Sequence, residues 1–475
     1  MSTNSSREIK SICCIGAGYV GGPTMAVIAE QCPEIKVTVL DINQKRIDDW
    51  NSQDLKKLPI FELGLSEIIS KTRGKNLFFS SDIETGIKDS DLIFISVNTP
   101  TKKSGVGAGE ASDLHWIETC ARQIATYSKG HTIVVEKSTI PVRTAEALKN
   151  ILHNTKTKEE DSKTFSILSN PEFLSEGNAL NDLKKPDRVL IGGDNIESIE
   201  ILVSIYKRWI EEPKIIRTNL WSSELSKLAS NAFLSQRISS INSISAICEK
   251  AGANINEVSL AIGKDTRIGQ KFLKSGPGFG GSCFKKDLLS LIYLAKYLNL
   301  PEVANYWQVV VDLNNWQRKR ISNLIVEKFY GTLTNKKITI LGFTYKANTN
   351  DTRESAAIEI INNLRQEKAN IFIHDPKASY KQIYTDLGIE SFFKDKKGAY
   401  AKFEGCQISN SINEATNEAD AIIILTEWEE YYEINWNTII KTLRKPAWIF
   451  DTRSVIDLKE IKATKGVNIW QIGMG

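Results

Sequence analysis

The sequence predicts an α/β protein in which two domains with parallel β-sheets are joined by a long central helix and a helical middle section. Three observations predict this fold class. Up to about residue 219, short β-branched segments alternate with helical patterns, as in βαβ units. Between residues 220 and 328, apolar residues recur at spacings of three and four without a strand pattern. From residue 329 to residue 475 the alternation returns, which predicts a second, smaller α/β domain.

Each α/β region contains several short strand patterns. In the N-terminal region, residues 11–30 predict a strand, a tight turn and a helix, and the further strand patterns are 36–41, 91–100, 131–141, 165–177 and 187–193. In the C-terminal region the strand patterns are 336–346, 369–376, 419–428 and 447–455. The polar segments 154–164 and 394–405 predict a solvated loop and a surface insertion.

Composition excludes several classes of protein. Hydrophobic residues make up 41% and charged residues 25% of the chain, with a net charge of +4, so we expect neither a nucleic-acid partner nor a membrane. The start is polar, and no apolar run reaches the ~18 residues of a membrane span. Seven cysteines without framework spacing predict reduced thiols and a cytoplasmic location. The four histidines are scattered, so we expect no metal site.

A dinucleotide fingerprint opens the chain. Residues Gly16, Gly18 and Gly21 have GxGxxG spacing between an apolar strand and a helix, and Asp41 ends the next strand. The first glycine allows the turn, the second admits the pyrophosphate, and the third lets helix and strand pack closely. A carboxylate at position 41 favours NAD over NADP, although Arg46 nearby weakens that argument. We therefore predict a Rossmann-like NAD-binding domain.

A single cysteine stands between a glycine-rich turn and an apolar helical run. Cys283 follows "GFGG", precedes Lys285 and Lys286, and lies four residues before Asp287. A helix N-terminus and nearby cations stabilise a thiolate, and the carboxylate shares the helix face of the thiol. The residues alone leave two readings open, a catalytic thiol and a buried core cysteine.

Two further pairs of polar residues have i, i+4 spacing. Lys227 and Asn231 could donate to an oxyanion from one helix face, but on these residues alone a solvated helix face is the favoured interpretation. Glu172 and Glu176 follow an Asn-Pro turn, and either could be a base or a helix-start carboxylate.

At this point a family resemblance appears. The segments are "GAGYVGGPT", "SVNTPT", "EKSTIPV", "SNPEFLSEG", "SELSKLASNAFLSQRISS", "GFGGSCFKKD", "TYKANTNDTRES" and "FDTR". In this order, from about residue 11 to residue 453, the chain resembles the UDP-glucose/GDP-mannose dehydrogenase family, in its animal and plant type. The resemblance implies four-electron oxidation of UDP-glucose to UDP-glucuronate with two NAD and no metal. It also implies a thiohemiacetal and a thioester on Cys283, followed by hydrolysis.

The resemblance also implies a role for each matching residue and region. The implied catalytic residues are Cys283, Lys227, Asn231, Asp287, Glu172 and Thr139. The implied cofactor contacts are Gly16, Gly18, Tyr19, Val20, Gly21, Asp41, Arg46, Thr99, Thr139, Glu176 and Arg353. The implied substrate contacts are Glu172, Phe173, Leu174, Lys227, Asn231, Arg267, Lys274, Phe279, Gly280, Phe343, Lys346 and Arg453. The implied regions are an NAD-binding domain (1–219), a helical linker and dimerisation region (220–328) and a UDP-sugar-binding Rossmann-like domain (329–475).

The resemblance carries further expectations and leaves rivals. Arg267 is expected to enter the site of a neighbouring subunit, in a homo-oligomer that is a dimer or a hexamer of dimers. Two positions depart from the family pattern: Leu63 replaces a usual proline, and Thr452 leaves the backbone at Arg453 in doubt. The rivals are a relative acting on GDP-mannose or an N-acetylated UDP-sugar, and a catalytically silent scaffold that binds NAD and a UDP-sugar. The set of Cys283, Lys227, Asn231 and Asp287 argues against the scaffold.

Overall fold

The computed structural model describes residues 8–155, 163–389, 405–459 and 465–475. The chain divides into two compact units, of which the first comprises residues 1–230 and 289–300 and the second residues 231–288 and 301–475. The predicted loop at 154–164 and the predicted insertion at 394–405 fall largely outside the described residues.

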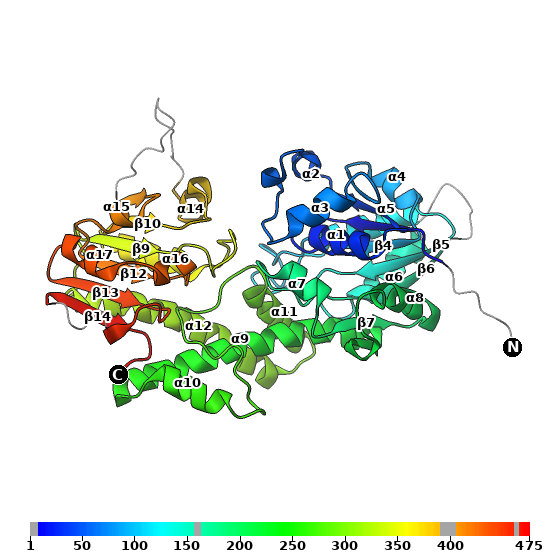
Figure 1. The fold of residues 1–475 in the computed structure, drawn as a ribbon. Coiled ribbons are helices and arrows are strands. Elements are labelled where there is room, and N and C mark those ends of the chain that lie inside the picture. The colour runs from blue at the N-terminus through cyan, green and yellow to red at the C-terminus, as the bar shows by residue number, and fades with distance from the viewer. Residues whose placement is uncertain (1–7, 156–162, 390–404, 460–464) are drawn as a thin grey trace. The chain divides into compact units, whose positions relative to one another are not determined.

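An eight-stranded sheet forms the first unit (Figure 1). Its strands are β1 (Ser11–Ile15), β2 (Lys36–Leu40), β3 (Leu77–Ser80), β4 (Leu92–Ile95), β5 (His131–Glu136), β6 (Thr164–Ser169), β7 (Val189–Gly193) and β8 (Ile215–Thr218). The strand order is β3-β2-β1-β4-β5-β6-β7-β8, and all neighbours are parallel except β6 and β7. The order reverses between β1 and β4, the place where dinucleotides bind in open α/β sheets. Strands β3 and β8 were not predicted, because each has only four residues, too few for a clear strand pattern.

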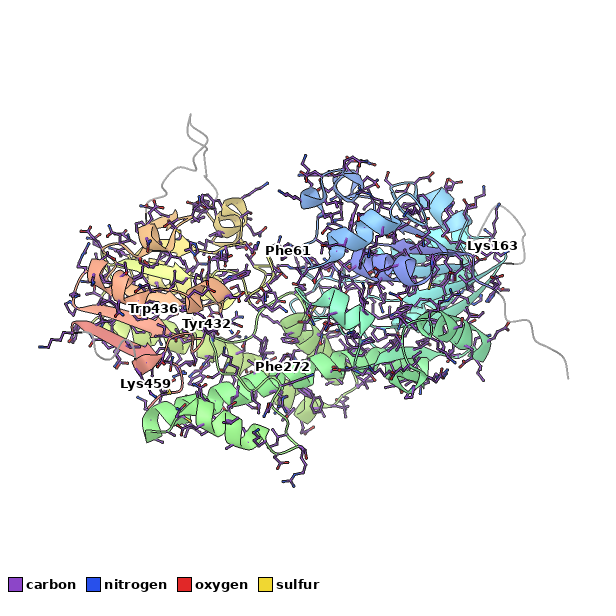
Figure 2. All side chains as sticks on the ribbon, viewed as in Figure 1. Phe61, Lys163, Phe272, Tyr432, Trp436 and Lys459 are labelled. Carbon is purple, nitrogen blue, oxygen red and sulfur yellow. The ribbon has the colours of Figure 1, made fainter. Side chains whose placement is uncertain are left out.

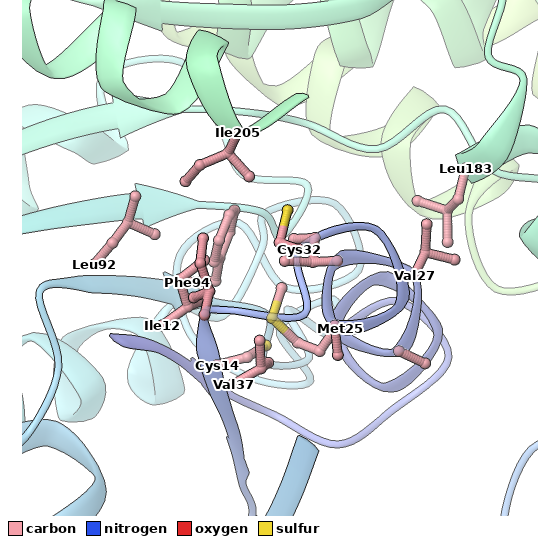
Figure 3. Close-up of a cluster of buried hydrophobic side chains, with 14 of the residues drawn as sticks. Ile12, Cys14, Met25, Val27, Cys32, Val37, Leu92, Phe94, Leu183 and Ile205 are labelled. Carbon is pink, nitrogen blue, oxygen red and sulfur yellow. The ribbon is translucent and has the colours of Figure 1, made fainter. Parts of the chain in front are cut away.

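Helices cover both faces of this sheet. They are α1 (Gly21–Gln31), α2 (Gln44–Asn51), α3 (Leu65–Thr72), α4 (Ile83–Lys88), α5 (His115–Tyr127), α6 (Thr144–Asn154), α7 (Ala179–Lys184) and α8 (Ile196–Tyr206), with the 3₁₀ turns η1 (Leu55–Lys57) and η2 (Glu212–Lys214). The adjacent residues Cys13 and Cys14 of β1 point to opposite faces of the sheet. Cys13 packs with α4, α5 and α6, whereas Cys14 packs with α1 and α8. Figure 3 shows the second cluster, in which Cys14 and Phe94 of the sheet meet Met25 of α1. Both thiols are packing residues, as strand alternation predicts.

The predicted helical section is present. It consists of α9 (Leu220–Ala251), α10 (Ile255–Gly263), α11 (Phe284–Tyr297) and α12 (Pro301–Lys328). Helix α9 has 32 residues and begins at Leu220, and α12 ends at Lys328, where the strand pattern resumes in the sequence. The boundary between the two units falls inside α9 and α11.

A second, entirely parallel sheet forms the core of the second unit. Its strands are β9 (Lys337–Leu341), β10 (Asn370–His374), β11 (Cys406–Ile408), β12 (Ala421–Ile424), β13 (Ala447–Asp451) and β14 (Val467–Gln471), in the order β11-β10-β9-β12-β13-β14. Its helices are α13 (Ala356–Gln366), α14 (Tyr380–Asp386), α15 (Ile412–Thr416), α16 (Glu429–Tyr432) and α17 (Trp436–Thr442). The order reverses between β9 and β12, so this sheet has its own topological switch point. The predicted fold class, two Rossmann-like domains joined by a long helix, is confirmed.

Within the part of the chain that the structure describes, none of the helices combines the length and the hydropathy that a membrane crossing requires.

Candidate active site

The glycine turn after β1 is held from two sides. Gly16 has φ +111°, and a Cβ there would lie 2.2 Å from the Ser96 carbonyl oxygen after β4. A Cβ on Gly21, the first residue of α1, would lie 2.0 Å from the Gly16 carbonyl oxygen. A Cβ on Gly18 would meet nothing within 4 Å. Gly16 and Gly21 are therefore required by packing, whereas Gly18 leaves open space at the N-terminus of α1, where a pyrophosphate binds in this arrangement.

Asp41 is a fixed acceptor beside this turn. Its carboxylate accepts from the backbone N–H groups of Ala17 (3.0 Å) and Asn43 (2.9 Å), and it is 8% exposed. Arg46 Nη1 donates to the same carboxylate at 2.9 Å. The buried Trp50 indole donates to the Ala17 carbonyl (3.0 Å), which ties α2 to the turn. Because Arg46 is paired with Asp41, part of the charge of Arg46 is already neutralised. A 2′-phosphate would therefore have to bind beside the Asp41 carboxylate, which favours NAD over NADP.

The other predicted cofactor loops of the first unit are joined to one another. Thr99, after β4, donates its hydroxyl proton to the Thr139 carbonyl at 2.8 Å. Tyr19, just before α1, packs partly buried on the hydrophobic cluster of that face. Glu176 is followed by Gly177, whose backbone amide donates to the Glu62 carboxylate at 2.6 Å. Glu62 also accepts from the Ala179 amide (3.0 Å), so this buried carboxylate fixes the segment and the start of α7. Sequence reasoning missed Glu62, because its partners lie more than a hundred residues away.

A buried ion pair connects α9 with the segment after β6. Lys227 Nζ lies 3.1 Å from a Glu172 carboxylate oxygen, and the two side chains are 4% and 8% exposed. The Leu174 amide donates to the same carboxylate at 2.7 Å. Burial alone raises the pKa of Glu172, but Lys227, this amide and a second lysine outweigh burial and leave the pKa below its usual value. Glu172 is therefore ionised, and the alternative of a solvated helix face at Lys227 is wrong.

The predicted substrate residue Phe173 lies between two cations. The Arg188 guanidinium stands 3.7 Å from the centre of the Phe173 ring, and Lys227 Nζ stands 5.5 Å from it. Arg188 also donates to the Ser230 hydroxyl at 3.2 Å. Burial lowers the pKa of Arg188. Sequence reasoning missed Arg188, since nothing in "KPDRVL" distinguishes it from a surface arginine.

Two carboxyl groups meet at the end of β5, on the face of the sheet that packs against α5 and α6. Glu136, the last residue of β5, is buried beside Glu224 of α9. Glu224 accepts from the amides of Arg143 (2.6 Å) and Ala145 (2.9 Å), which begin α6. Burial and mutual repulsion raise the pKa of Glu136, and burial raises the pKa of Glu224 to about 7. The pair therefore holds a proton at neutral pH.

Cys283 directly precedes helix α11 in the second unit. Its carbonyl accepts from the Asp287 amide at 2.9 Å, which closes the first turn of the helix. Asn231 Nδ2 donates to Asp287 Oδ2 at 2.5 Å, and both residues are buried. Lys286 Nζ lies 3.7 Å from the other Asp287 oxygen. Cys283 is half-buried, whereas the other six cysteines are buried, so the packing-cysteine alternative loses its support.

Protein packing explains the glycines that precede the thiol. A Cβ on Gly280 would lie 2.5 Å from the Glu354 carbonyl oxygen, and one on Gly281 would lie 2.9 Å from the Tyr345 ring. The Phe279 amide donates to Asn314 of α12 (2.7 Å), and the Phe279 side chain is buried. The turn is thus clamped between α12 and the loop after β9.

Three Asp-Thr-Arg triplets form the same local turn. In each, the arginine amide donates to the aspartate two residues before it, at 2.9 to 3.0 Å; the pairs are Asp265–Arg267, Asp351–Arg353 and Asp451–Arg453. The guanidinium groups of Arg267 and Arg353 also fold back onto these aspartates. The Arg267 side chain is exposed.

Arg453 differs from the other two arginines. Its guanidinium donates to the carbonyls of Leu425 (2.8 Å) and Tyr345 (3.3 Å) at the switch point of the second sheet. Thr452, the departure from the family pattern, is buried and donates to the Ile424 carbonyl (2.6 Å). The backbone at Arg453 is therefore firmly held, and the doubt raised by Thr452 is removed.

The remaining predicted substrate residues occupy different environments. Lys346 follows β9 at the switch point, and its Nζ lies 5.6 Å from the Tyr345 ring centre. Lys274 donates to the Tyr432 hydroxyl at 3.3 Å, and Tyr432 is labelled in Figure 2. Phe343 is fully buried in the core of the second unit, and its amide donates to Asp375 (2.6 Å). Only the backbone of Phe343 therefore faces the switch point.

The structure groups five of the six predicted catalytic residues into two sets, and Thr139 is instead linked through its carbonyl to Thr99. Glu172 and Lys227 form one set in the first unit, and Asn231, Cys283 and Asp287 form the other in the second unit. Lys227 and Asn231 lie four residues apart in the continuous helix α9, so helical geometry puts them on one face. Among the described residues, no group of three or more histidine, cysteine or acidic side chains could hold a metal ion.

A sheet with a glycine turn at its switch point, a carboxylate after β2 and a buried lysine–glutamate pair define a nicotinamide-dinucleotide-dependent oxidoreductase. The site residues fit NAD, because Gly18 leaves room for the pyrophosphate and Asp41 is a fixed acceptor. Sequence models of the UDP-glucose/GDP-mannose dehydrogenase family match residues 10–210 (NAD binding domain), 221–316 (central domain) and 339–458 (UDP binding domain). The chain belongs to this family and is an NAD-dependent oxidoreductase.

Individual relatives agree with this assignment. The chain is 53% identical to the UDP-glucose 6-dehydrogenase of Bos taurus over 472 residues, covering 98% of this chain and 93% of that protein. It is 50% identical to UDP-glucose 6-dehydrogenase 3 of Oryza sativa subsp. japonica over 472 residues, covering 97% and 96%. The solved UDP-glucose dehydrogenase of Pyrobaculum islandicum superposes with a TM-score of 0.83 at 26% identity, covering 100% and 99% of the two chains.

Proposed function

We propose that this enzyme oxidises UDP-glucose to UDP-glucuronate, with two NAD reduced for each sugar. One observation carries the proposal: about half of the residues are identical to UDP-glucose 6-dehydrogenases of animals and a plant over nearly the whole chain. The half-buried thiol at a helix start and the buried pair Lys227–Glu172 supply the chemical groups that this oxidation needs. Bound NAD would accept a hydride from the sugar carbon C6 in each oxidation.

Each catalytic residue has a role that its surroundings support. Lys227 and Asn231 donate hydrogen bonds to the C6 oxygen and stabilise the charge that develops there. Asp287 takes one amide hydrogen of Asn231 and thereby orients the other toward the substrate. Glu172 is held as a carboxylate, so together with Thr139 it can hold a water molecule and accept a proton from it.

Cys283 explains how one site performs two oxidations. Its thiolate adds to the aldehyde carbon, which retains the intermediate and restores a carbon that can lose a second hydride. The resulting thioester is hydrolysed by water, which supplies the second carboxylate oxygen and returns the thiol. Lys346 and Arg453 bind the UDP-sugar at the switch point of the second sheet, with Phe279 and Gly280 from the glycine turn. The other predicted contacts keep their assigned roles in cofactor or substrate binding.

The assembly and location follow from the same proposal. The working enzyme is a homo-oligomer, a dimer or a hexamer of dimers, in which Arg267 completes the site of a neighbouring subunit. The exposed guanidinium of Arg267 supports this role. We place the enzyme in the cytoplasm, where NAD and UDP-glucose are available and its thiols stay reduced.

The stoichiometry of NADH formation tests the proposal. With limiting UDP-glucose and excess NAD, absorbance at the NADH band should reach two NADH per sugar, and the product should be the uronate. GDP-mannose and an N-acetylated UDP-sugar serve as alternative substrates in parallel reactions. Faster turnover of either would assign the enzyme to another substrate, and no turnover of any sugar would favour a silent scaffold.

A further inference from the structure

Strand β5 ends at Glu136, and Lys137 follows it; the side chains of these two ionisable residues lie on opposite faces of the sheet. Ile133 and Val135 of β5 belong to the hydrophobic cluster beside α1, whereas Val134 belongs to the cluster beside α5. Because side chains alternate along a strand, Lys137 continues the α1 face and Glu136 the α5 face. Both residues are buried, so the α1 face carries a buried amine that the roles assigned above do not use.

The amine of Lys137 is held in one position. Its Nζ donates to Asn170 Oδ1 at 2.9 Å and lies 3.4 Å from the Tyr206 hydroxyl. Tyr206 donates to the same Asn170 oxygen at 2.6 Å, and Asn170 Nδ2 donates to the Leu190 carbonyl at 2.8 Å. Asn170 lies two residues before Glu172. Lys137 therefore anchors the start of the segment that carries the proposed catalytic carboxylate.

Among the residues that the structure describes, few charges act on this amine. The titratable groups that face it are Cys14 from β1, Tyr206 from α8, Lys227 from α9 and Glu172 after β6. Burial raises the pKa values of Cys14 and Tyr206 far above neutrality, so both are uncharged. The charged neighbours of Lys137 are thus Glu172, which attracts it, and Lys227, which repels it.

In the proposed function, Lys227 has to serve both Glu172 and the substrate. In the structure Lys227 neutralises Glu172 at 3.1 Å, but in the proposed function Lys227 also donates to the C6 oxygen of the substrate. A buried carboxylate that loses its partner takes up a proton instead of remaining charged. We propose that Lys137 is a positioning residue that keeps Glu172 ionised and in place while Lys227 serves the substrate. This inference rests on the roles given to Glu172 and Lys227 in the proposed function.

The pH profile of kcat/KM separates this role from simple packing. Lys137→Met removes the charge but keeps an apolar chain of similar length. Because loss of the cation raises the pKa of Glu172, the acid limb of the profile should move to higher pH, by about one pH unit. At a pH on the acid side of both profiles, kcat of Lys137→Met should be about tenfold lower than kcat of wild type. KM for UDP-glucose should stay within about twofold, since Lys137 is not among the proposed substrate contacts. The control Tyr206→Phe removes a hydroxyl from the same cluster but keeps the amine, and its acid limb should coincide with that of the wild type.

Infrared spectroscopy tests the coupling without any turnover. Spectra of the full chain with and without Glu172→Gln isolate the carboxylate band of Glu172. Burial lowers the pKa of Lys137 to about 8, so in the wild type this band should shift as the pH passes through about 8. Lys137→Met should abolish the shift.

The outcomes are distinct. An unshifted acid limb in a folded Lys137→Met, or a Glu172 band that does not respond near pH 8 in the wild type, overturns the inference. If Lys137→Met fails to fold, the wild-type band alone decides. If the wild type does not oxidise UDP-glucose but its band responds near pH 8, the proposed function fails, while the electrostatic link between Lys137 and Glu172 stands.

Discussion

Substitution of two glycines of the fingerprint turn by alanine should have different effects, one on stability and the other on NAD binding. Gly16→Ala should destabilise the first unit, because φ is +111° and the Cβ would lie 2.2 Å from the Ser96 carbonyl oxygen. Gly18→Ala should leave the fold intact and weaken NAD binding, because its Cβ meets no protein atom within 4 Å and would instead occupy space beside the pyrophosphate. The pair is matched, since the same atom is added two residues apart.

The magnitudes follow from the two environments. At Gly16 the overlapping contact must lengthen by about 1 Å, which costs roughly 1–3 kcal/mol of overpacking, and the backbone conformation costs roughly 1–3 kcal/mol more. In a unit of this size, each kcal/mol lowers the Tm by about 2–4 °C, so a loss of roughly 5–20 °C is expected. At Gly18 the stability should change by less than about 1 kcal/mol. Its NAD affinity should fall roughly tenfold to a hundredfold, or about 1.4–2.7 kcal/mol.

Calorimetry of the full chain and a fluorescence titration with NAD measure the two effects. Added NAD should raise the Tm of wild type more than that of Gly18→Ala at the same concentration. The reasoning is refuted if Gly18→Ala unfolds as early as Gly16→Ala, or if it binds NAD as tightly as wild type.

Three further predictions concern the thiol, the assembly and the buried carboxyl pair. Cys283→Ser should keep NAD and UDP-glucose binding but slow uronate formation by roughly 10³-fold, and a covalent sugar adduct should be visible in the intact mass; near-native turnover would contradict the thioester route. Mixed Arg267→Ala and Cys283→Ala chains, each inactive alone, should regain activity after confirmed subunit exchange; no recovery would mean that each site is built from one chain. Folding raises the pKa of Glu224 from 4.5 to about 7, so the free energy of unfolding of wild type should fall as the pH rises from about 4.5 to about 7, by up to about 1.4 kcal/mol per pH unit, whereas Glu224→Gln should show a flatter profile over the same range; equal slopes would show that the carboxyl pair holds no extra proton.

Local sequence patterns predicted much of this structure. Helix α9 begins at Leu220 and α12 ends at Lys328, where helical periodicity starts and stops in the sequence, because apolar spacing reflects the face that a helix buries. The position of Cys283 at a helix start was also predictable, since the glycines before it and the apolar run after it are local signals. The specific roles of the site residues came from the family resemblance and stay predictions.

Long-range partners could not be predicted. Lys137 follows a strand, where a charged residue ordinarily meets solvent, yet the fold brings Tyr206 and Asn170 to it from 69 and 33 residues away. Glu136 meets Glu224 in the same way, across the sheet from that network. Neither burial nor pairing at such a separation leaves a periodic signal, so only the assembled structure reveals these groups.

The Asp-Thr-Arg turns have a consequence for ligand selection. Arg267 and Arg353 each carry a counter-ion on the same short loop, two residues away, at the high effective concentration of an intramolecular partner. A simple monovalent anion such as chloride competes poorly with that tethered carboxylate, whereas a phosphate can offer two charges and several acceptor oxygens. Any anion that either arginine binds must therefore compete with an aspartate of the same loop, and added salt, which screens exposed ion pairs, should weaken the hold of that aspartate.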